Sequence, residues 1–310
     1  YDVDFKLLGQ KKRRTKAQAG VEAGLDRIVR TINDALTEAD RLPEDIIGIG
    51  VGSPGPLDLD KGTILDTPNL GWKNVKLAEH LKSIYGCPAV ICNDVDAGTF
   101  GEYSFGAAKK ARCAIGVFPG TGIGGGCVYE GKMVRGAVGS CFEIGHMQVL
   151  PDGPLCGCGK RGCLEAVASR LAIATACLAA AYRGEAPYLL QKTGSDLSNI
   201  RSGVLAEAVK AGDKAVETIL RNAARWLGVG VANVVNLMAP DVVVLGGGLV
   251  EAMPELFADE VEKAARKRVM SAFEKSFTVA VAKLGDNATA KGAAAWAREV
   301  IGPANGKQAG

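Results

Sequence analysis

The segment "IGVFPGTGIGGG" (Ile115–Gly126) joins a short apolar run to a cluster of glycines. A second segment, "IGIGVGSPGP" (Ile47–Pro56), has the same order of features. Short apolar runs bounded by glycine and proline are typical of buried strands that end in tight loops. The two segments therefore predict corresponding strand–loop units in two similar halves of the chain.

Helical patterns alternate with these strands. Apolar residues recur at helical spacing over 20–40, and further helices are predicted over 77–86, 203–212 and 215–238. This alternation predicts an α/β fold with largely parallel central strands. A chain of 310 residues is long enough for two domains. We therefore expect a boundary near 107–112 and an active site in the cleft between the halves.

Composition argues against several classes of protein. Hydrophobic residues make up 47% and charged residues 23% of the chain, and the net charge is +3. These values are ordinary for a soluble globular protein and indicate neither a nucleic-acid nor a membrane partner. The basic run Lys11–Lys16 lacks interleaved aromatic residues, so we interpret it as the solvated end of a strand or strand pair over 2–15.

No membrane or export segment is predicted. The chain opens without an apolar leader, and "LAIATACLAAAY" (Leu171–Tyr182) is too short to span a bilayer. The nine cysteines are an odd number, and six of them are scattered singly. This usage fits a reducing cytoplasm better than a disulfide framework.

Metal-binding residues cluster in "FEIGHMQVLPDGPLCGCGKRGCLEAVASR" (Phe142–Arg170). Cys156, Cys158 and Cys163 form a C-x-C-x4-C pattern, and His146 precedes it by ten residues. Three thiolates and one imidazole are a standard ligand set for tetrahedral structural Zn²⁺. The alternative is a loop with three free, redox-active thiols.

Two glutamates flank this cluster. Metal ligation would fix the carboxylates of Glu143 and Glu165, and carboxylates form short, strong hydrogen bonds with sugar hydroxyls. The alternative is that both are solvated surface side chains, with Glu165 simply opening a helix. The two interpretations are left open for Glu165.

An acidic residue follows another predicted buried strand. In "ICNDVDAG", Asp94 stands between a strand and a helix, where its carboxylate can accept a proton from an attacking hydroxyl. The alternative role is a helix N-cap. Asp96 is a rival for either role.

The glycine clusters are candidates for a nucleotide site. "FPGTGIGGG" (Phe118–Gly126) offers backbone N–H groups and the Thr121 hydroxyl, which suit a phosphate. It is neither a P-loop nor a dinucleotide fingerprint, because it lacks G-K-[ST] and a hairpin follows it. "LGGGL" around Gly246–Gly248 can accept the rest of a nucleotide. Tight turns alone explain either cluster equally well.

Together, these motifs resemble the ROK family of sugar kinases and repressors, and most closely its glucokinase-like members. The resemblance extends over 1–302 and rests on "EIGHM…CGCGKRGCLEA", "GVGSPGPLD", "TPNLGW", "CNDVDA", "GTGIGGG" and "VVLGGGL". It implies two ribonuclease-H-like α/β domains of the actin-like ATPase type, with an interdomain cleft that closes on ATP and a hexose. The expected domains are 1–108 with 291–310, and 109–290.

The resemblance also implies roles for individual residues. Asp94 is expected to deprotonate the 6-hydroxyl of the sugar, most simply glucose. The remaining expected sets are a sugar-binding set of Gly55, Asn69, Asn93, Asp94, Glu143, His146 and Glu165, a nucleotide set of Gly120, Thr121, Gly122, Gly246 and Gly247, and a zinc set of His146, Cys156, Cys158 and Cys163. The implied cofactors are ATP, Mg²⁺ and structural Zn²⁺, and a homodimer or homotetramer is expected.

One feature departs from the family pattern. Its kinases open with a strand and a D-x-G-G-T-K phosphate loop, and this chain begins just after that place. We expect the natural protein to start upstream. The alternative functions are a sugar-responsive repressor with an upstream DNA-binding module, a sugar-binding pseudokinase, or a kinase for N-acetylmannosamine or another hexose.

Overall fold

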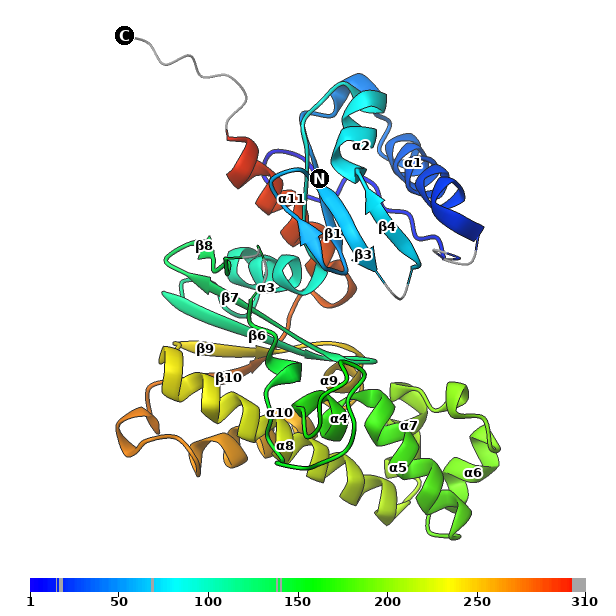
Figure 1. The fold of residues 1–310 in the computed structure, drawn as a ribbon, viewed down its shortest axis with the longest axis vertical. Helices are drawn as coiled ribbons and strands as arrows, with labels where there is room; N and C mark the ends of the chain where they lie inside the picture. Colours follow the sequence, from blue (N-terminus) through cyan, green and yellow to red (C-terminus); the bar gives the residue numbers. More distant parts are fainter. Residues whose placement is uncertain (15, 17–18, 68–69, 138, 140, 303–310) are drawn as a thin grey trace. The chain divides into compact units, whose positions relative to one another are not determined.

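The computed structural model describes residues 1–302 except 15, 17, 18, 68, 69, 138 and 140. The protein is a mixed α/β fold that divides into two compact units (Figure 1). The first unit comprises Tyr1–Ser104, Val134–Cys141 and Asp286–Gly310, and the second comprises Phe105–Met133 and Phe142–Gly285.

The segment Val134–Cys141 belongs to the first unit, although the sequence analysis assigned it to the larger domain. Its Arg135 guanidinium lies 4.3 Å from the centre of the Trp296 ring in the first unit. A guanidinium over an indole face is attracted by the ring's negative quadrupole. This contact helps to attach the segment to the first unit. It could not be predicted from the spacing of residues in the sequence.

Two strands of the first unit run parallel and end at the same edge. β1 (Ile49–Ser53) pairs with β5 (Ala89–Asn93), and Ser53 is in register with Asn93. A separate antiparallel sheet is formed by β2 (Leu57–Asp58), β3 (Thr63–Thr67) and β4 (Trp72–Val75). The loop after β1 and the start of the helix after β5 therefore lie side by side.

The helices of the first unit cover these sheets. They are α1 (Gly20–Glu38), α2 (Leu77–Tyr85), α3 (Asp94–Phe105) and α11 (Ala288–Ile301). The apolar stripe predicted for α1 is confirmed, because its Val, Leu and Ile side chains pack against a core that includes Leu57, Trp72 and Leu81. Gly24 of α1 allows close approach, since a Cβ there would lie 2.1 Å from Cζ2 of Trp72.

The predicted strand or strand pair over 2–15 is wrong for its described residues. They form a turn and an irregular segment that runs along α1. Lys11 Nζ lies 2.9 Å from an oxygen of Glu38, Arg13 pairs with Asp34, and a Cβ on Gly9 would lie 2.3 Å from the Ala35 carbonyl. Lys11 and Arg13 are therefore partners of α1 and do not mark a strand end.

The second unit is built on a five-stranded sheet in the order β10-β9-β6-β7-β8. β6 (Cys113–Pro119), β9 (Val242–Leu245) and β10 (Thr278–Val281) are parallel, whereas β7 (Ile123–Tyr129) and β8 (Lys132–Met133) continue the sheet antiparallel. The predicted strand, glycine loop and hairpin are confirmed here.

The second unit also contains a group of helices (Figure 1). The long α8 (Lys214–Met238) packs on α10 (Pro254–Arg266) and buries one complete side. The other helices of this unit are α4 (Leu164–Ala168), α5 (Arg170–Tyr182), α6 (Pro187–Thr193), α7 (Ser202–Lys210) and α9 (Gly248–Ala252). In the described part of the chain, short 3-10 helices are formed by Pro43–Asp45, Ile144–His146, Leu197–Asn199, Ser271–Phe273 and Gly285–Asn287.

One stretch, Leu164–Tyr182, is long and apolar enough to cross a membrane by length and composition. It is two helices, because the backbone of Ser169 is extended between α4 and α5. Both helices pack against α8. These features are typical of a core helix pair.

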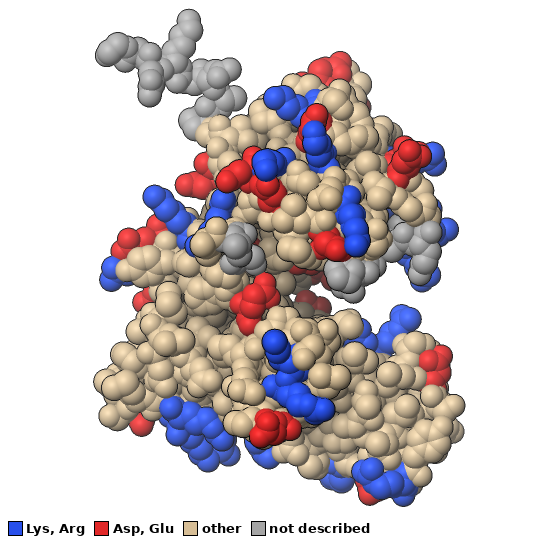
Figure 2. Space-filling view, viewed as in Figure 1, with Lys and Arg blue, Asp and Glu red and all other residues tan. Residues whose placement is uncertain are grey.

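Charges on the surface are mixed. Figure 2 shows basic side chains in small separate groups with acidic side chains between them on the visible face. Extended fields of positive charge mark nucleic-acid-binding surfaces. This face therefore adds no support for a nucleic-acid partner.

Candidate active site

The junction between β5 and α3 carries the predicted base. Asn93 ends the strand, and its Oδ1 accepts the N–H groups of Val95 at 2.9 Å and Asp96 at 3.3 Å. These bonds satisfy the first N–H groups of α3, as an N-cap does. The capping role that the sequence offered to Asp94 is thus performed mainly by Asn93.

The Asp94 side chain is consequently not the main cap of this helix. Its Oδ1 accepts the Val95 N–H at 3.0 Å, and its backbone carbonyl accepts the Thr289 hydroxyl of α11 at 3.2 Å. Burial raises the pKa of the Asp94 carboxyl, and the hydrogen bond from Val95 opposes this only in part. A raised pKa makes the carboxylate a better proton acceptor, as a general base requires.

Gly55 and Asn93 lie close together in the first unit. A Cβ on Gly55 would lie 3.8 Å from Nδ2 of Asn93, and a Cβ on Gly52 would lie 3.4 Å from the Asp94 Cα. The structure thus brings together three of the predicted sugar-binding residues. The fourth on this side, Asn69, lies outside the described residues.

The glycine loop of the second unit connects β6 to β7. Gly120 N–H donates to the Gly122 carbonyl at 2.8 Å, which closes a tight turn around Thr121. Thr121 is exposed at the tip of this turn. The turn therefore places Thr121 at the surface of the loop.

The second predicted glycine cluster lies beside this loop. β9 is parallel to β6 with Leu245 in register with Val117, and Gly246 N–H donates to the Val117 carbonyl at 3.1 Å. Gly247 has a φ of 83°, and a Cβ there would lie 2.9 Å from the Pro119 carbonyl. Positive φ and close approach both require glycine at this position. The predicted nucleotide-binding residues therefore share one edge of the sheet.

Glu165 contacts the glycine loop directly. Its Oε2 accepts the Ile123 N–H at 2.9 Å, and a Cβ on Gly122 would lie 2.2 Å from that oxygen. Its Oε1 lies 3.6 Å from Cys156 Sγ. The solvated-surface interpretation of Glu165 is therefore wrong, because the carboxylate joins the loop to the cysteine cluster.

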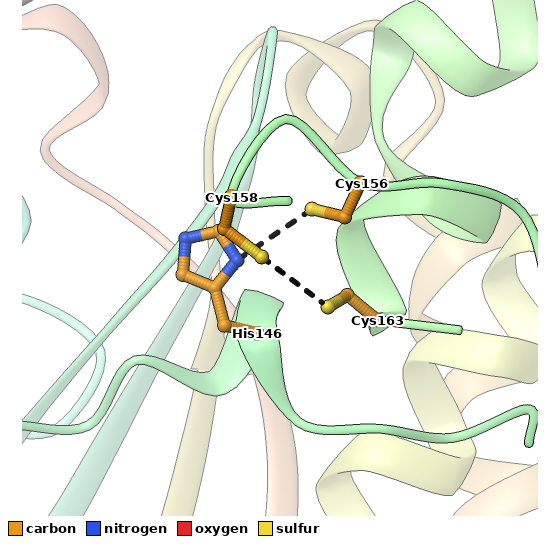
Figure 3. Close-up of side chains that lie close together, drawn as sticks. All are labelled: His146, Cys156, Cys158 and Cys163. Atoms are coloured by element: carbon orange, nitrogen blue, oxygen red, sulfur yellow. Dashed lines mark hydrogen bonds between the residues drawn. The ribbon is translucent and has the colours of Figure 1, made fainter. Parts of the chain in front are cut away.

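The predicted zinc ligands converge. The ligand atoms of His146, Cys156, Cys158 and Cys163 all lie within 4.8 Å of one another. Figure 3 shows these side chains directed toward a common centre, with Cys156 Sγ 3.7 Å from His146 Nδ1 and Cys158 Sγ 3.7 Å from Cys163 Sγ. Tetrahedral ligation with Zn–S bonds of about 2.3 Å separates two sulfurs by about 3.8 Å. The donor set and its spacing fit Zn²⁺.

The thiols differ in their acidity. Burial raises the pKa of Cys156 to about 12 and also raises the pKa of Cys163, whereas the backbone N–H of Lys160 lowers the pKa of Cys158. A bound Zn²⁺ deprotonates its thiol ligands and offsets this burial effect. None of the nine cysteines, all of which are described, forms a disulfide.

The remaining predicted sugar ligands, Glu143 and His146, are exposed at either end of the short helix Ile144–His146. His146 N–H donates to the Glu143 carbonyl at 2.9 Å. Ile144 between them is buried and packs on β7. This turn therefore anchors the backbone that carries Glu143 and the His146 ring of the cysteine cluster.

Sequence reasoning missed Arg170. Its Nη2 donates to Thr121 Oγ1 at 2.6 Å, and its backbone N–H donates to the Gly120 carbonyl at 2.9 Å. The available signal for Arg170 in the sequence was its position directly after Ser169. Ser169 caps α5 through its hydroxyl. Contact with a loop 49 residues earlier was not visible in the sequence.

Comparison with known proteins shows that this chain is similar to sugar kinases and to regulators. Residues 2–300 match the profile of the ROK family. A glucokinase of Thermotoga maritima is 33% identical over 96% of this chain and 92% of its own length. A glucokinase of Streptomyces coelicolor is 33% identical over 88% of this chain and 87% of its own. The chain therefore belongs to the ROK family.

Solved structures agree with this assignment. A ROK family glucokinase from Streptomyces griseus, in complex with glucose and AMPPNP, superposes with a TM-score of 0.83 at 32% identity, covering 96% of this chain and 94% of that chain.

A xylose repressor of Caldicellulosiruptor bescii is 31% identical over 84% of this chain and 65% of its own length. The family thus includes both enzymes and regulators among the relatives of this chain.

Proposed function

We propose that this protein is an ATP-dependent hexose kinase that phosphorylates the 6-hydroxyl of glucose. The observation that carries the proposal is the similarity, over nearly the whole chain, to a glucokinase solved with glucose and AMPPNP. The half-buried Asp94 with its raised pKa supports the same chemistry. The expected arrangement of two ribonuclease-H-like domains around the substrates stays a prediction.

Asp94 is the proposed general base. Its carboxylate accepts the proton of the sugar 6-hydroxyl while that oxygen forms a bond to the γ-phosphorus of ATP. The bond between this phosphorus and the bridging oxygen breaks, and ADP leaves with the electron pair. Asn93 supports this role because its side chain accepts the Val95 and Asp96 N–H groups, so capping of α3 does not depend on the Asp94 carboxylate.

Binding of the sugar is proposed for residues of both units. In the first unit these are Gly55, Asn93 and Asp94, together with Asn69, which lies outside the described residues. Glu143, His146 and Glu165 are the proposed ligands in the second unit. Glu165 already accepts the Ile123 N–H, but an ionised carboxylate has about four acceptor sites and can also accept a hydroxyl.

The nucleotide is proposed to bind at the shared edge of β6 and β9. Gly120, Thr121 and Gly122 are proposed to contact its phosphates, and Gly246 and Gly247 its adenosine. The tight turn and the positive φ of Gly247 allow a ligand to approach the backbone closely. Mg²⁺ is expected to arrive with the ATP phosphates. Among the described residues, the group of three or more His, Cys, Asp or Glu side chains that could hold a metal ion is the cysteine–histidine cluster.

Zinc is proposed to be held by His146, Cys156, Cys158 and Cys163. When bound, a four-ligand Zn²⁺ contributes rigidity and no open position for chemistry. Glu165 follows the last of these residues by two positions, and Cys156 Sγ lies 3.6 Å from its carboxylate. The metal site is therefore proposed to act through the orientation of Glu165.

A sugar-responsive repressor is the second candidate, because xylose repressors are among the relatives. A carboxylate with a raised pKa at the β5–α3 junction favours the kinase, since a repressor requires no base.

We also propose a cytoplasmic location, which suits nine cysteines without disulfides. A homodimer or homotetramer is the expected assembly.

An ADP-release assay of the purified protein with ATP and a panel of hexoses tests the proposal. Glucose, mannose, fructose, allose, N-acetylglucosamine and N-acetylmannosamine should be compared at equal concentrations. Turnover that is highest with glucose supports the proposal. Absence of sugar-dependent ADP release with every sugar, while sugar binding is retained, would favour the regulator.

A further inference from the structure

Arg170 is placed where a ligand phosphate would be held. It is the first residue of α5, and its Nη2 donates to the Thr121 hydroxyl at 2.6 Å. Its backbone N–H donates to the Gly120 carbonyl at 2.9 Å. Both parts of the residue therefore contact the loop between β6 and β7, and the side chain is half-buried against it.

The positive charge of Arg170 has no carboxylate partner in the part of the chain that the structure describes. A guanidinium has five N–H donors, and one of them is used on Thr121. Glu165 of α4 also contacts this loop, but its two oxygens face Ile123 N–H and Cys156 Sγ. The guanidinium is thus left with donors that no described acceptor satisfies.

The position is also unfavourable for a cation. The N-terminus of an α-helix carries partial positive charge, which repels a basic side chain in the first turn. The first turn of α5 contains no acidic residue that would compensate. An incoming anion would relieve this repulsion.

Backbone donors lie beside the guanidinium. Gly120 N–H is used in the turn, and Ile123 N–H is used by Glu165. Within the described ranges, the N–H groups of Thr121 and Gly122 have no protein acceptor. Successive free N–H groups next to a fixed cation form a concave site for phosphate oxygens.

We propose that Arg170, together with the N–H groups of Thr121 and Gly122, binds the polyphosphate chain of ATP and stabilises the negative charge that develops during transfer. This inference rests on the proposed function for the identity of the nucleotide. The guanidinium forms no covalent bond in the reaction. It donates hydrogen bonds to phosphate oxygens while the sugar oxygen bonds to phosphorus and the bridging oxygen departs.

Isothermal titration calorimetry with AMPPNP and with adenosine tests the assignment. Arg170→Met should weaken AMPPNP binding by about tenfold or more, because a charge-assisted hydrogen-bond donor to phosphate is lost, and should leave adenosine binding unchanged. Arg183→Met is the matched control, since Arg183 follows the same helix and pairs only with Glu185 at the surface. Equal AMPPNP affinity in Arg170→Met and the unmodified protein would overturn the proposal.

Two further variants separate phosphate binding from support of the loop. If Arg170 acts only by holding Thr121, Thr121→Val should reproduce the whole loss and Arg170→Met should add nothing to it. Phosphate binding predicts a larger loss in Arg170→Met, with partial recovery in Arg170→Lys. Thermal melting by circular dichroism should show an unchanged or higher Tm for Arg170→Met, because a cation leaves the helix N-terminus.

The outcome is distinguishable from failure of the proposed function. If the protein binds AMPPNP in an Arg170-dependent way but phosphorylates no hexose, the Arg170 site is supported and the kinase assignment is wrong. A protein that phosphorylates glucose while Arg170→Met binds AMPPNP normally retains the kinase assignment and loses the Arg170 site.

Discussion

Cys156 Sγ lies 3.6 Å from Oε1 of Glu165, and the other oxygen of this carboxylate accepts the Ile123 N–H. One side chain thus links the proposed metal site to the glycine loop of the proposed nucleotide site. Both links are within the second unit. They imply that the state of the metal site affects the shape of the loop.

Replacing Cys158 with Ser should remove the metal. The variant loses one of four converging ligands, and closed structural sites depend on all of them. Inductively coupled plasma mass spectrometry should find about one zinc per chain in the unmodified protein and almost none in the variant. Cys87→Ser, which changes a buried thiol outside the cluster, should keep the metal. Equal zinc content in both variants would contradict the ligand assignment.

Replacing Glu165 with Ala should destabilise the second unit. Ile123 is buried, and its N–H would lose its acceptor, which costs about 1–3 kcal/mol in unfolding free energy. Glu165→Gln keeps an acceptor oxygen and should recover most of that loss. Urea denaturation measures both variants, and faster hydrogen exchange at Ile123 should accompany only the alanine variant. Identical stabilities of the two variants would argue against this hydrogen bond.

Replacing Asp94 with Asn should abolish turnover and spare sugar binding. General-base catalysis contributes about 10²–10⁴-fold to rate, and asparagine cannot accept the proton. Asp66→Asn, which changes an exposed carboxylate on β3, should leave the rate unchanged. Steady-state kinetics and glucose titration measure both effects. Near-normal turnover in Asp94→Asn would refute the role of the base.

The pH dependence of activity should also reflect Asp94. Its pKa is raised above the ordinary value of 3.8 by burial, and only the ionised form accepts a proton. The acidic limb of kcat/KM should therefore have its midpoint above 3.8, with the rate increasing as pH rises through the raised pKa. A limb at or below the ordinary value would contradict the effect of burial.

The raised pKa of Asp94 has the opposite effect on stability, because this contribution to folding decreases as pH rises. The folded state favours the protonated carboxyl, so the stabilising contribution of Asp94 is full below the ordinary value and is lost as pH rises through the raised pKa. Asp94→Asn should consequently match or exceed the unmodified protein in Tm at pH values above that range. Thermal melting across pH, with Asp66→Asn as the control, measures the difference.

Replacing Gly122 with Ala should disturb the loop. The new Cβ would lie 2.2 Å from Glu165 Oε2, so the carboxylate must leave Ile123 or the loop must move. We expect a loss of about 1–3 kcal/mol in unfolding free energy together with weaker AMPPNP binding. Gly203→Ala is the matched control, because a Cβ there meets nothing within 4 Å and alanine favours its helix. Unchanged AMPPNP affinity in Gly122→Ala would contradict the contact.

Local pattern predicted much of the fold. The apolar spacing over 20–40 and 215–238 predicted α1 and α8, because helices of that length repeat their buried face every three to four residues. The strand, glycine loop and second strand over 113–129 were predicted because short apolar runs there are bounded by glycine and proline. The zinc set was predicted because residue type and spacing alone define such a site.

Contacts between distant segments could not be predicted from one sequence. The assignment of Val134–Cys141 to the first unit depends on packing that includes the Arg135–Trp296 contact. The opening segment was mistaken for a strand because its apolar residues suit either structure, and partners on α1 decided the outcome. The Arg170–Thr121 bond likewise joins residues that only the fold brings together.

The eight residues from Cys163 to Arg170 contain a thiol of the cluster, the carboxylate on Ile123 and the guanidinium on Thr121. A reagent that oxidises the Cys163 thiol therefore acts seven residues from the guanidinium that contacts the glycine loop. If the proposed zinc were lost, we therefore expect the alignment of the glycine loop, and with it the proposed activity, to be impaired.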